Sequence, residues 1–243
     1  VIAGLAAGLL LAEPDFGGAA MVVGTALVMG FLGGIRLRHL LGSALAILPV
    51  GIWAVFGSAY RYQRVVAFLD PWAYPQTSGF QLRQSLIAFG RGEYTGVGLG
   101  DGVQKLFYLP EPHTDFIFAV IGEELGMIGT LGVILLYALL IQRGFAIAAR
   151  APSAYGRLTA QGLTFIIGFQ AAAHMGVNLG LLPTKGLTLP LVSYGGSSLV
   201  TTLAALGILA SIDRAGREVA RPERRRAAAP SASPAARPAG AHP

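Results

Sequence analysis

The chain turns from polar to apolar at Tyr108-Leu-Pro-Glu-Pro-His-Thr-Asp115-Phe-Ile-Phe118, where a segment held by two prolines meets a long hydrophobic run. Asp115 stands at this border. A carboxylate beside hydrocarbon is costly unless it is paired, hydrogen-bonded or hydrated, so such residues in membrane proteins are functional candidates. A structural role is equally open, because Asp is a preferred N-cap residue for a helix beginning near Phe116, and Thr114 could cap it as well. Capping and catalysis do not exclude each other.

Composition places the chain among membrane proteins. Of its 243 residues, 53% are hydrophobic and 12% are charged, against a charged share of about 25% in soluble domains. The absence of cysteine excludes disulfides and thiolate metal sites. The chain opens at Val1 inside an apolar run without a charged leader, so we expect the C-terminal portion of a longer protein, with no signal peptide in view.

Hydrophobic segments predict an all-α polytopic membrane protein. Residues 1–12 are too short to span, because a crossing takes about 20 residues, and they are expected to be a truncated helix. Five further runs are long enough to cross the membrane: residues 18–35, 40–56, 116–141, 158–179 and 197–212. A large polar loop, about 58–115, separates the second and third of these runs.

The distribution of arginine predicts the orientation. Arginines lie close to the ends of the apolar runs on one set of loops, at Arg36, Arg38, Arg143, Arg150, Arg157 and throughout the tail 214–243. This face is expected to be cytoplasmic, although the large loop also carries basic residues. The tail is rich in Arg, Ala, Pro and Ser, so we expect a disordered basic cytoplasmic segment. No aromatic residues interleave with its arginines, and no nucleic-acid partner is therefore expected.

The large loop contains one helical pattern. Phe80, Leu82, Leu86, Ile87 and Phe89 fall largely on one side of a helical wheel, which predicts an interfacial helix on the outer leaflet. The glycine-rich strip Gly96–Gly100 lacks a following Lys-Ser or Lys-Thr, so it is interpreted as a flexible turn and not as a phosphate loop.

A second irregular segment, residues 182–198, lies between the last two crossings. Its prolines and glycines predict a re-entrant or broken segment, which is tolerated only where protein or water covers the backbone. Lys185 within it is either a snorkelling residue or the partner of an acid on the same face. Glu123 and Glu124 either face a wet cavity or bond to neighbours, and His174 is most simply a buried polar group bonded to another helix.

Several ordered motifs carry a resemblance to a known family. They are Pro14–Gly17, Ala67–Trp72, Gln84–Gly90, Val97–Gly100, Gln104-Lys105, Leu109–Phe118, Glu123–Gly126, Thr184–Pro190 and Ser193–Ser198. Together they resemble the SEDS family (shape, elongation, division, sporulation), and its cell-division branch more than its elongation branch. The resemblance implies that residues 1–213 form the C-terminal half of a SEDS membrane domain. Tyr74 and Asp101-Gly102 depart from the family pattern, which puts fine loop contacts in doubt.

The resemblance also implies an activity, that of a peptidoglycan glycosyltransferase that polymerises lipid II at the division septum. Asp115 would be the general base of an inverting displacement, and Lys185 would compensate the charge of the departing diphosphate. The further substrate-binding residues expected on this basis are Asp15, Arg61, Arg64, His113, Glu111 and Ser193.

The same resemblance implies partners and a location. The partners would be lipid II with its undecaprenyl-linked glycan, a class B penicillin-binding transpeptidase of the FtsI type and other divisome proteins. The location would be the cytoplasmic (inner) membrane, with the site on its outer face. A divalent cation such as Mg²⁺ or Mn²⁺ suits carboxylates and phosphates, but the sequence shows no ligand cage, so no cofactor is assigned. A lipid II flippase and a noncatalytic divisome scaffold are the alternative functions.

Overall fold

The computed structural model describes residues 2–13, 15–57, 59–74, 79–107 and 109–227, and within these ranges the secondary structure is helical without strands. The helices are, in chain order, α1 (Ile2–Ala12), α2 (Phe16–Leu32), α3 (Leu37–Phe56), α4 (Ala59–Leu69), α5 (Phe80–Gly92), α6 (Gln104–Phe107), α7 (Ile117–Arg150), α8 (Ala154–Asn178) and α9 (Gly196–Ala227). The predicted stub and five crossings correspond to α1, α2, α3, α7, α8 and α9. The all-α prediction is therefore confirmed.

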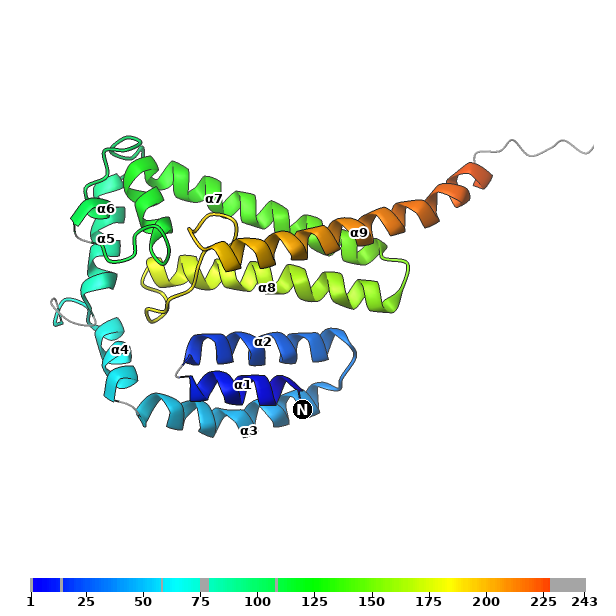
Figure 1. The fold of residues 1–243 in the computed structure, drawn as a ribbon, viewed down its shortest axis with the longest axis horizontal. Helices are drawn as coiled ribbons and strands as arrows, with labels where there is room; N and C mark the ends of the chain where they lie inside the picture. Colours follow the sequence, from blue (N-terminus) through cyan, green and yellow to red (C-terminus); the bar gives the residue numbers. More distant parts are fainter. Residues whose placement is uncertain (1, 14, 58, 75–78, 108, 228–243) are drawn as a thin grey trace, which may run out of the picture.

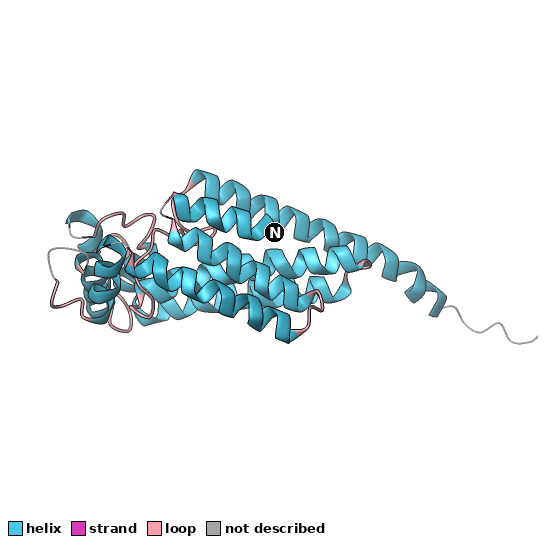
Figure 2. Ribbon diagram, turned by 90° about the horizontal axis from the view of Figure 1, so that it is seen from below, coloured by secondary structure: helices cyan, strands magenta, loops and turns pink. Residues whose placement is uncertain are grey.

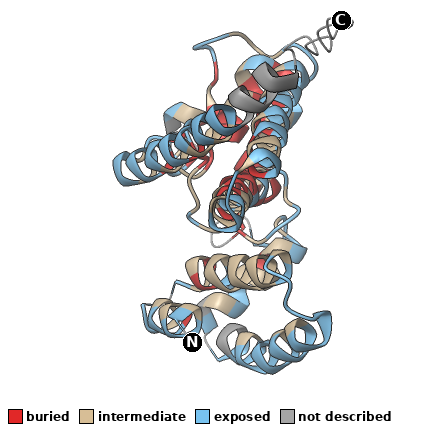
Figure 3. Cartoon of the chain, turned by 90° about the vertical axis from the view of Figure 1, so that its right-hand side faces the viewer, coloured by how far each residue is buried: buried red, intermediate tan, exposed pale blue. Residues whose placement is uncertain are grey.

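The long helices form two groups that run side by side, α1–α3 and α7–α9, and α2 contacts α8 between them (Figure 1). Ile117–Arg150 and Gly196–Val219 are long and apolar enough to cross a bilayer, while Ile2–Ala12, Phe16–Leu32 and Leu37–Trp53 are shorter apolar helices. Buried residues concentrate in the second group (Figure 3). There α8 buries mainly small residues, including Ala160, Gly168 and Ala171, and small residues let membrane helices approach closely.

The connections lie at two opposite ends of these groups. The α2–α3 and α7–α8 turns and the C-terminal end of α9 lie at one end, while α4, α5 and α6 lie across the other (Figure 1). Most of the irregular backbone gathers at that second end (Figure 2). The arginine-bearing turns thus share one face, as the sequence predicted, and by the charge rule that face is expected to be cytoplasmic.

The helix α7 is broken at Gly126, whose φ of 65° and ψ of −158° are non-helical. Such a conformation strongly favours glycine, and a Cβ here would lie 2.7 Å from the carbonyl oxygen of Gly92. The loop after α5 fills the break. The N–H groups of Met127 and Ile128 donate to the carbonyls of Glu93 and Tyr94, and the N–H of Val97 donates to the carbonyl of Glu123. The broken helix therefore recovers its hydrogen bonds from the protein, as a nonhelical segment at membrane depth requires.

Two expectations about helices outside the crossings are wrong in part. The pattern at residues 80–89 does form a helix, but α5 does not lie free on the leaflet, since it buries Leu82, Ser85 and Ala88 and packs against α7. Amphipathic periodicity does not distinguish a face that meets lipid from one that meets protein.

The second correction concerns the tail. The helix α9 continues to Ala227, so residues 214–227 are helical where disorder was expected. Arg214 pairs with Glu218 and Arg217 with Asp213, both at i,i+4 spacing, which supports a helix. The rest of the tail, 228–243, lies outside the described residues.

The arrangement predicts accessibility from opposite sides of the membrane. Leu99 and Tyr155 are exposed side chains at the two ends, 77% and 81% exposed. In intact cells, a cysteine at Leu99 should react with an impermeant maleimide added outside, and a cysteine at Tyr155 should react only after permeabilisation. Labelling of both positions from outside would contradict the orientation.

Candidate functional site

Asp115 lies directly before α7, but its side chain does not cap that helix. The N-cap residue is Phe116, and it makes no side-chain capping bond. The cap comes instead from α8, where Asn178 Oδ1 accepts a hydrogen bond of 3.1 Å from the N–H of Ala119. Among the described residues, the recorded hydrogen bonds of Asp115 use only its main chain, with its N–H donating to Glu111 and its carbonyl accepting from Asn178. Its carboxylate is left available for other chemistry.

The surroundings of Asp115 make its carboxyl a stronger proton acceptor than an exposed aspartate, because they raise its pKa. Burial raises the pKa of its carboxyl above the ordinary value, Glu111 adds to the rise, and Arg64 opposes it. The carboxylate faces the irregular segment after α8, because a Cβ placed on Gly186 would lie 3.2 Å from Asp115 Oδ2. Lys185 directly precedes Gly186, so Asp115 and Lys185 belong to one site although they are far apart in the chain.

Lys185 extends from this segment toward the start of α2. Its Nζ lies 5.0 Å from the centroid of the Phe16 ring, an arrangement in which an ammonium is attracted by the aromatic face. Burial lowers the pKa of Lys185, and the Asp15 carboxylate opposes that shift. Asp15 also caps α2, since its Oδ1 accepts from the N–H of Gly18 at 2.9 Å. Asp15 thus fixes the helix end that the lysine faces.

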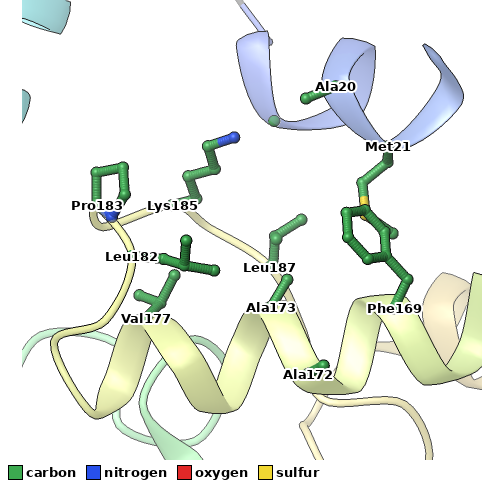
Figure 4. A pocket seen from close by; sticks show the side chains of 11 residues that line it. Ala20, Met21, Phe169, Ala172, Ala173, Val177, Leu182, Pro183, Lys185 and Leu187 are labelled. Atoms are coloured by element: carbon green, nitrogen blue, oxygen red, sulfur yellow. The ribbon is translucent and has the colours of Figure 1, made fainter. Parts of the chain in front are cut away.

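A cavity of about 380 Å³ lies between α2 and α8 (Figure 4). Its walls are almost wholly apolar, and Lys185 is the one charged residue among those that line it: Gly17, Ala20, Met21, Phe169, Ala172, Ala173, Val177, Leu182, Pro183, Lys185 and Leu187. The arrangement suits an elongated apolar group attached to an anionic head.

Arg61 and Arg64 approach the site from α4. Arg64 Nη1 donates to the carbonyl oxygen of Thr184 at 3.3 Å, next to Lys185 in the chain. The Nε of Arg61 is buried and has no hydrogen-bond partner among the described residues. Both arginines belong to α4, and the bond from Arg64 places that guanidinium beside the Lys185 segment.

The other three predicted substrate-binding residues fall into two groups. Glu111 and His113 are exposed on the segment before Asp115, and the Thr114 hydroxyl donates to Glu111 Oε2 at 3.1 Å. Ser193, by contrast, is buried. Its hydroxyl donates to the carbonyl of Thr114 at 2.6 Å and accepts from the N–H of Leu189 at 2.7 Å.

The structure shows a structural role for Ser193. Its hydroxyl bonds to two backbone groups, and the neighbouring N–H of Tyr194 donates to the carbonyl of His113. This side chain joins the segment 182–195 to the segment before Asp115, and its expected role in substrate binding stays a prediction. Sequence reasoning could not separate the two roles, because both need a hydroxyl near the site.

The acidic residues deeper in α7 bond to neighbours, which settles the alternatives left open for them. Glu123 is fully buried and accepts from Arg91 Nη1 at 3.3 Å and from the N–H groups of Val103 and Gln104. Glu124 forms an ion pair with Lys105. These pairs hold α5 and α6 on α7, and they are structural.

Three side chains that sequence reasoning did not assign to the site support it: two of them hold the irregular segment, and the third holds the main chain of Asp115. Tyr137 donates to the carbonyl of Pro190, Gln170 donates to the carbonyl of Thr188 at 3.0 Å, and Asn178 bonds to the main chain of Asp115. His174, predicted to be buried and bonded, has its Nδ1 2.6 Å from the carbonyl oxygen of Leu187. The sequence does offer a signal for Asn178, because this polar residue follows His174 by one helical turn at the end of an apolar crossing, where a polar side chain needs a hydrogen-bond partner.

Among the residues that the structure describes, no group of three or more His, Asp or Glu side chains is placed to hold a metal ion. Any divalent cation at Asp115 would need oxygen ligands from a bound phosphate or from water.

A family model described as "Cell cycle protein" and named for FtsW, RodA and SpoVE matches residues 1–218. The chain belongs to this family. The match covers both helix groups and every site residue discussed above, so the SEDS resemblance predicted from the motifs is confirmed, and the chain is a polytopic membrane protein of that fold.

Similar proteins place the chain near the cell-division branch. It is 54% identical over 204 residues to the probable peptidoglycan glycosyltransferase FtsW of Methylococcus capsulatus, covering 83% of this chain and 51% of that protein. It is 51% identical over 212 residues to the protein of the same name in Legionella pneumophila, covering 86% and 54%. The chain thus spans about half the length of the curated relatives it matches.

Solved structures agree on the fold. A chain from a study of how a peptidoglycan synthase complex coordinates polymerization and crosslinking has a TM-score of 0.72 at 38% identity, covering 87% of this chain and 59% of that one. The rod shape determining protein RodA of Thermus thermophilus has a TM-score of 0.57 at 34% identity, covering 88% and 55%.

The two backbone hydrogen bonds of the Ser193 hydroxyl, called the Ser193 clamp below, are expected to stabilise the folded protein. Ser193→Ala should lower the free energy of unfolding by about 1–3 kcal/mol, because it leaves the buried N–H of Leu189 without its partner. Thermal unfolding of the purified full-length protein in detergent measures this. Ser43→Ala is the control, since Ser43 is exposed and bonds only to Leu40 of its own helix; equal melting temperatures for the two variants would contradict the clamp.

Proposed function

We propose that the full-length protein is a peptidoglycan glycosyltransferase that polymerises lipid II on the outer face of the membrane. The observation that carries this proposal is the placement of Asp115, a half-buried carboxylate that accepts no hydrogen bond from the described residues, against the segment of Lys185, which in turn lines an apolar cavity. Transfer of a sugar from a polyprenyl diphosphate needs three things: a base for the acceptor hydroxyl, a cation for the diphosphate, and an apolar cavity for the lipid chain.

The chemistry asks little of the protein beyond these elements. Asp115 would take the proton from the 4-hydroxyl of the acceptor N-acetylglucosamine, and the oxygen would attack the anomeric carbon of the donor sugar. A glycosidic C–O bond forms as the bond from that carbon to the diphosphate oxygen breaks. The diphosphate leaves with the electron pair, and a single displacement inverts the anomeric configuration.

Cations would stabilise the charge that develops on the leaving group. Lys185 lines the cavity, and Arg64 and Arg61 approach the same segment from α4. Desolvated cations aimed at developing charge are among the largest contributions to catalysis. A Mg²⁺ or Mn²⁺ bound to the diphosphate would supply further positive charge for the leaving group. Asp15 would act by holding the α2 end and Lys185, a role in cavity structure more than in contact with substrate.

The cavity supports a lipid-linked substrate. Its walls come from α2, α8 and the segment after α8, and among the described residues that line it only Lys185 is charged. The first isoprenyl units next to the diphosphate would fit there, with the rest of the chain in the bilayer. Glu111 and His113, both exposed, would meet the sugars outside.

The alternative of a lipid flippase is less well supported by the placement of charge. A transporter needs ionisable groups available along the crossing. In the described part of α7, Glu123 and Glu124 are both paired, and in α8 His174 bonds to Leu187. If the protein were a noncatalytic scaffold, replacing the Asp115 carboxylate by an amide would not impair its function.

Partners and location follow from the similar proteins as further parts of the proposal. Relatives named FtsW and a similar chain from a peptidoglycan synthase complex support a class B penicillin-binding transpeptidase of the FtsI type as partner. With other divisome proteins, the pair would work at the septum in the cytoplasmic membrane.

Replacing the base tests the enzyme against the alternatives. Asp115→Asn keeps the size of the side chain but removes the proton acceptor, so polymerisation should fall by about 10²-fold to 10⁴-fold. The measurement uses the full-length protein in detergent with lipid II and its transpeptidase partner, because flipping has no meaning without a second leaflet.

The matched control is Asp101→Asn, which makes the same change at an exposed carboxylate of the outer end. Lipid II binding should persist in both variants. Polymer at the wild-type rate from Asp115→Asn would remove this residue from the chemistry.

The neighbours of Asp115 predict opposite shifts in the pH profile. The base works when ionised, so kcat/KM falls as pH drops through its pKa. Glu111 raises that pKa and Arg64 lowers it. Glu111→Gln should therefore move the acid limb to lower pH, and Arg64→Gln should move it to higher pH. Only the position of the limb is compared, because the arginine also contributes to binding; shifts of both variants in one direction would contradict the assignment.

A further inference from the structure

Asn178, the last residue of α8, has every hydrogen-bonding group of its side chain engaged. Its Oδ1 accepts from the N–H of Ala119 at 3.1 Å, and its Nδ2 donates to the carbonyls of Asp115 at 3.0 Å and His174 at 2.9 Å. The side chain is fully buried. Its own carbonyl accepts from the Ser85 hydroxyl on α5 at 2.7 Å. One residue thus contacts α5, α7 and the main chain of Asp115.

We infer that Asn178 is a positioning residue for the base, capping α7 from a neighbouring helix and fixing the main chain of Asp115. The first N–H groups of any helix lack partners within it, and Asp or Thr before the helix would ordinarily satisfy one of them. Here Asn178 takes that task. The consequence is that the carboxylate of Asp115 is spared from capping while its backbone is held at the helix end.

The amide is suited to this double role. One end must accept from Ala119 and the other must donate to Asp115, and a carboxamide offers both in a fixed plane. A carboxylate of the same shape keeps the acceptor and loses the donors, and an alanine loses both. The two contacts can therefore be separated by substitution.

The same helix end also holds the cationic side of the site. His174, one turn before Asn178, contacts the carbonyl of Leu187, two residues after Lys185. The end of α8 is thus a common reference for Asp115 and for the Lys185 segment. If the end of α8 moved, the distance between Asp115 and Lys185 would change, and a misplacement of about 1 Å in a reacting group costs about 10²-fold in rate.

The test uses the full-length protein with lipid II and its transpeptidase partner, and it rests on the proposed function. Asn178→Ala should lower kcat by about 10²-fold with little change in KM for lipid II. Asn178→Asp keeps the acceptor for Ala119 but sets a buried carboxylate against the carbonyls of Asp115 and His174, so it should melt below the wild type while kcat per folded molecule also falls. Both variants are compared as kcat per folded molecule, and whichever of them folds at the assay temperature decides.

Thr164→Ala is the matched control. Thr164 is an equally buried polar residue of α8, and its hydroxyl bonds to Ala160 within the helix, away from the site. It should lower the melting temperature and leave kcat per folded molecule unchanged. Wild-type kcat in a folded Asn178 variant would overturn this inference alone. Absence of polymer from the wild-type protein would overturn the proposed function, and the inference with it.

Discussion

Backbone that is not helical near a membrane must form its hydrogen bonds within the protein. The site of this protein lies among the side chains and loops that supply those hydrogen bonds. Two such nonhelical stretches lie at the end that carries α4, α5 and α6: the break in α7 at Gly126 and the segment 182–195 after α8. The loop 92–98 repairs the first, and Tyr137, Gln170, His174 and Ser193 hold the second. Each polar side chain that bonds to this irregular backbone is itself held in place, and together these side chains give the adjoining site residues a rigid support.

The charged residues of the site gain their properties from the same partial burial. Desolvation disfavours the charged form of both Asp115 and Lys185, raising the pKa of one and lowering that of the other. An anionic head group entering beside Lys185 would restore the preference of the lysine for its charged form. On the proposed function, the site would therefore favour a bound diphosphate over water. The same diphosphate would disfavour ionisation of Asp115, and Arg64, which lowers the pKa of Asp115, would oppose that effect.

Sequence patterns were sufficient for the crossings and for bringing Asp115 and Lys185 to one face, because both follow from hydrophobic length and from counting passes through the bilayer. They were insufficient where two environments impose the same pattern. The apolar face of α5 would look alike against lipid or against α7, and the Ser193 hydroxyl would look alike as a ligand or as a clamp. Residues 214–227 were misjudged because composition was given more weight than the spacing of Asp213, Arg214, Arg217 and Glu218. The cap from Asn178 required knowing which helix end lies beside which.

The location of the cavity links these local features to the whole membrane domain. It lies where α2 meets α8, between a helix group with few buried residues and one that contains most of the core (Figure 3). Asp115 and its supports, Asn178 and the segment 182–195, all belong to the second group, while the first contributes the α2 end with Asp15 and Phe16. The segment 182–195 takes part in both features, because Leu182, Pro183, Lys185 and Leu187 line the cavity while Gly186 faces Asp115. In the proposed function, a lipid bound in the cavity would therefore contact the segment that lies against Asp115, whereas the bonds from Asn178 to Asp115 and Ala119 lie outside the cavity lining.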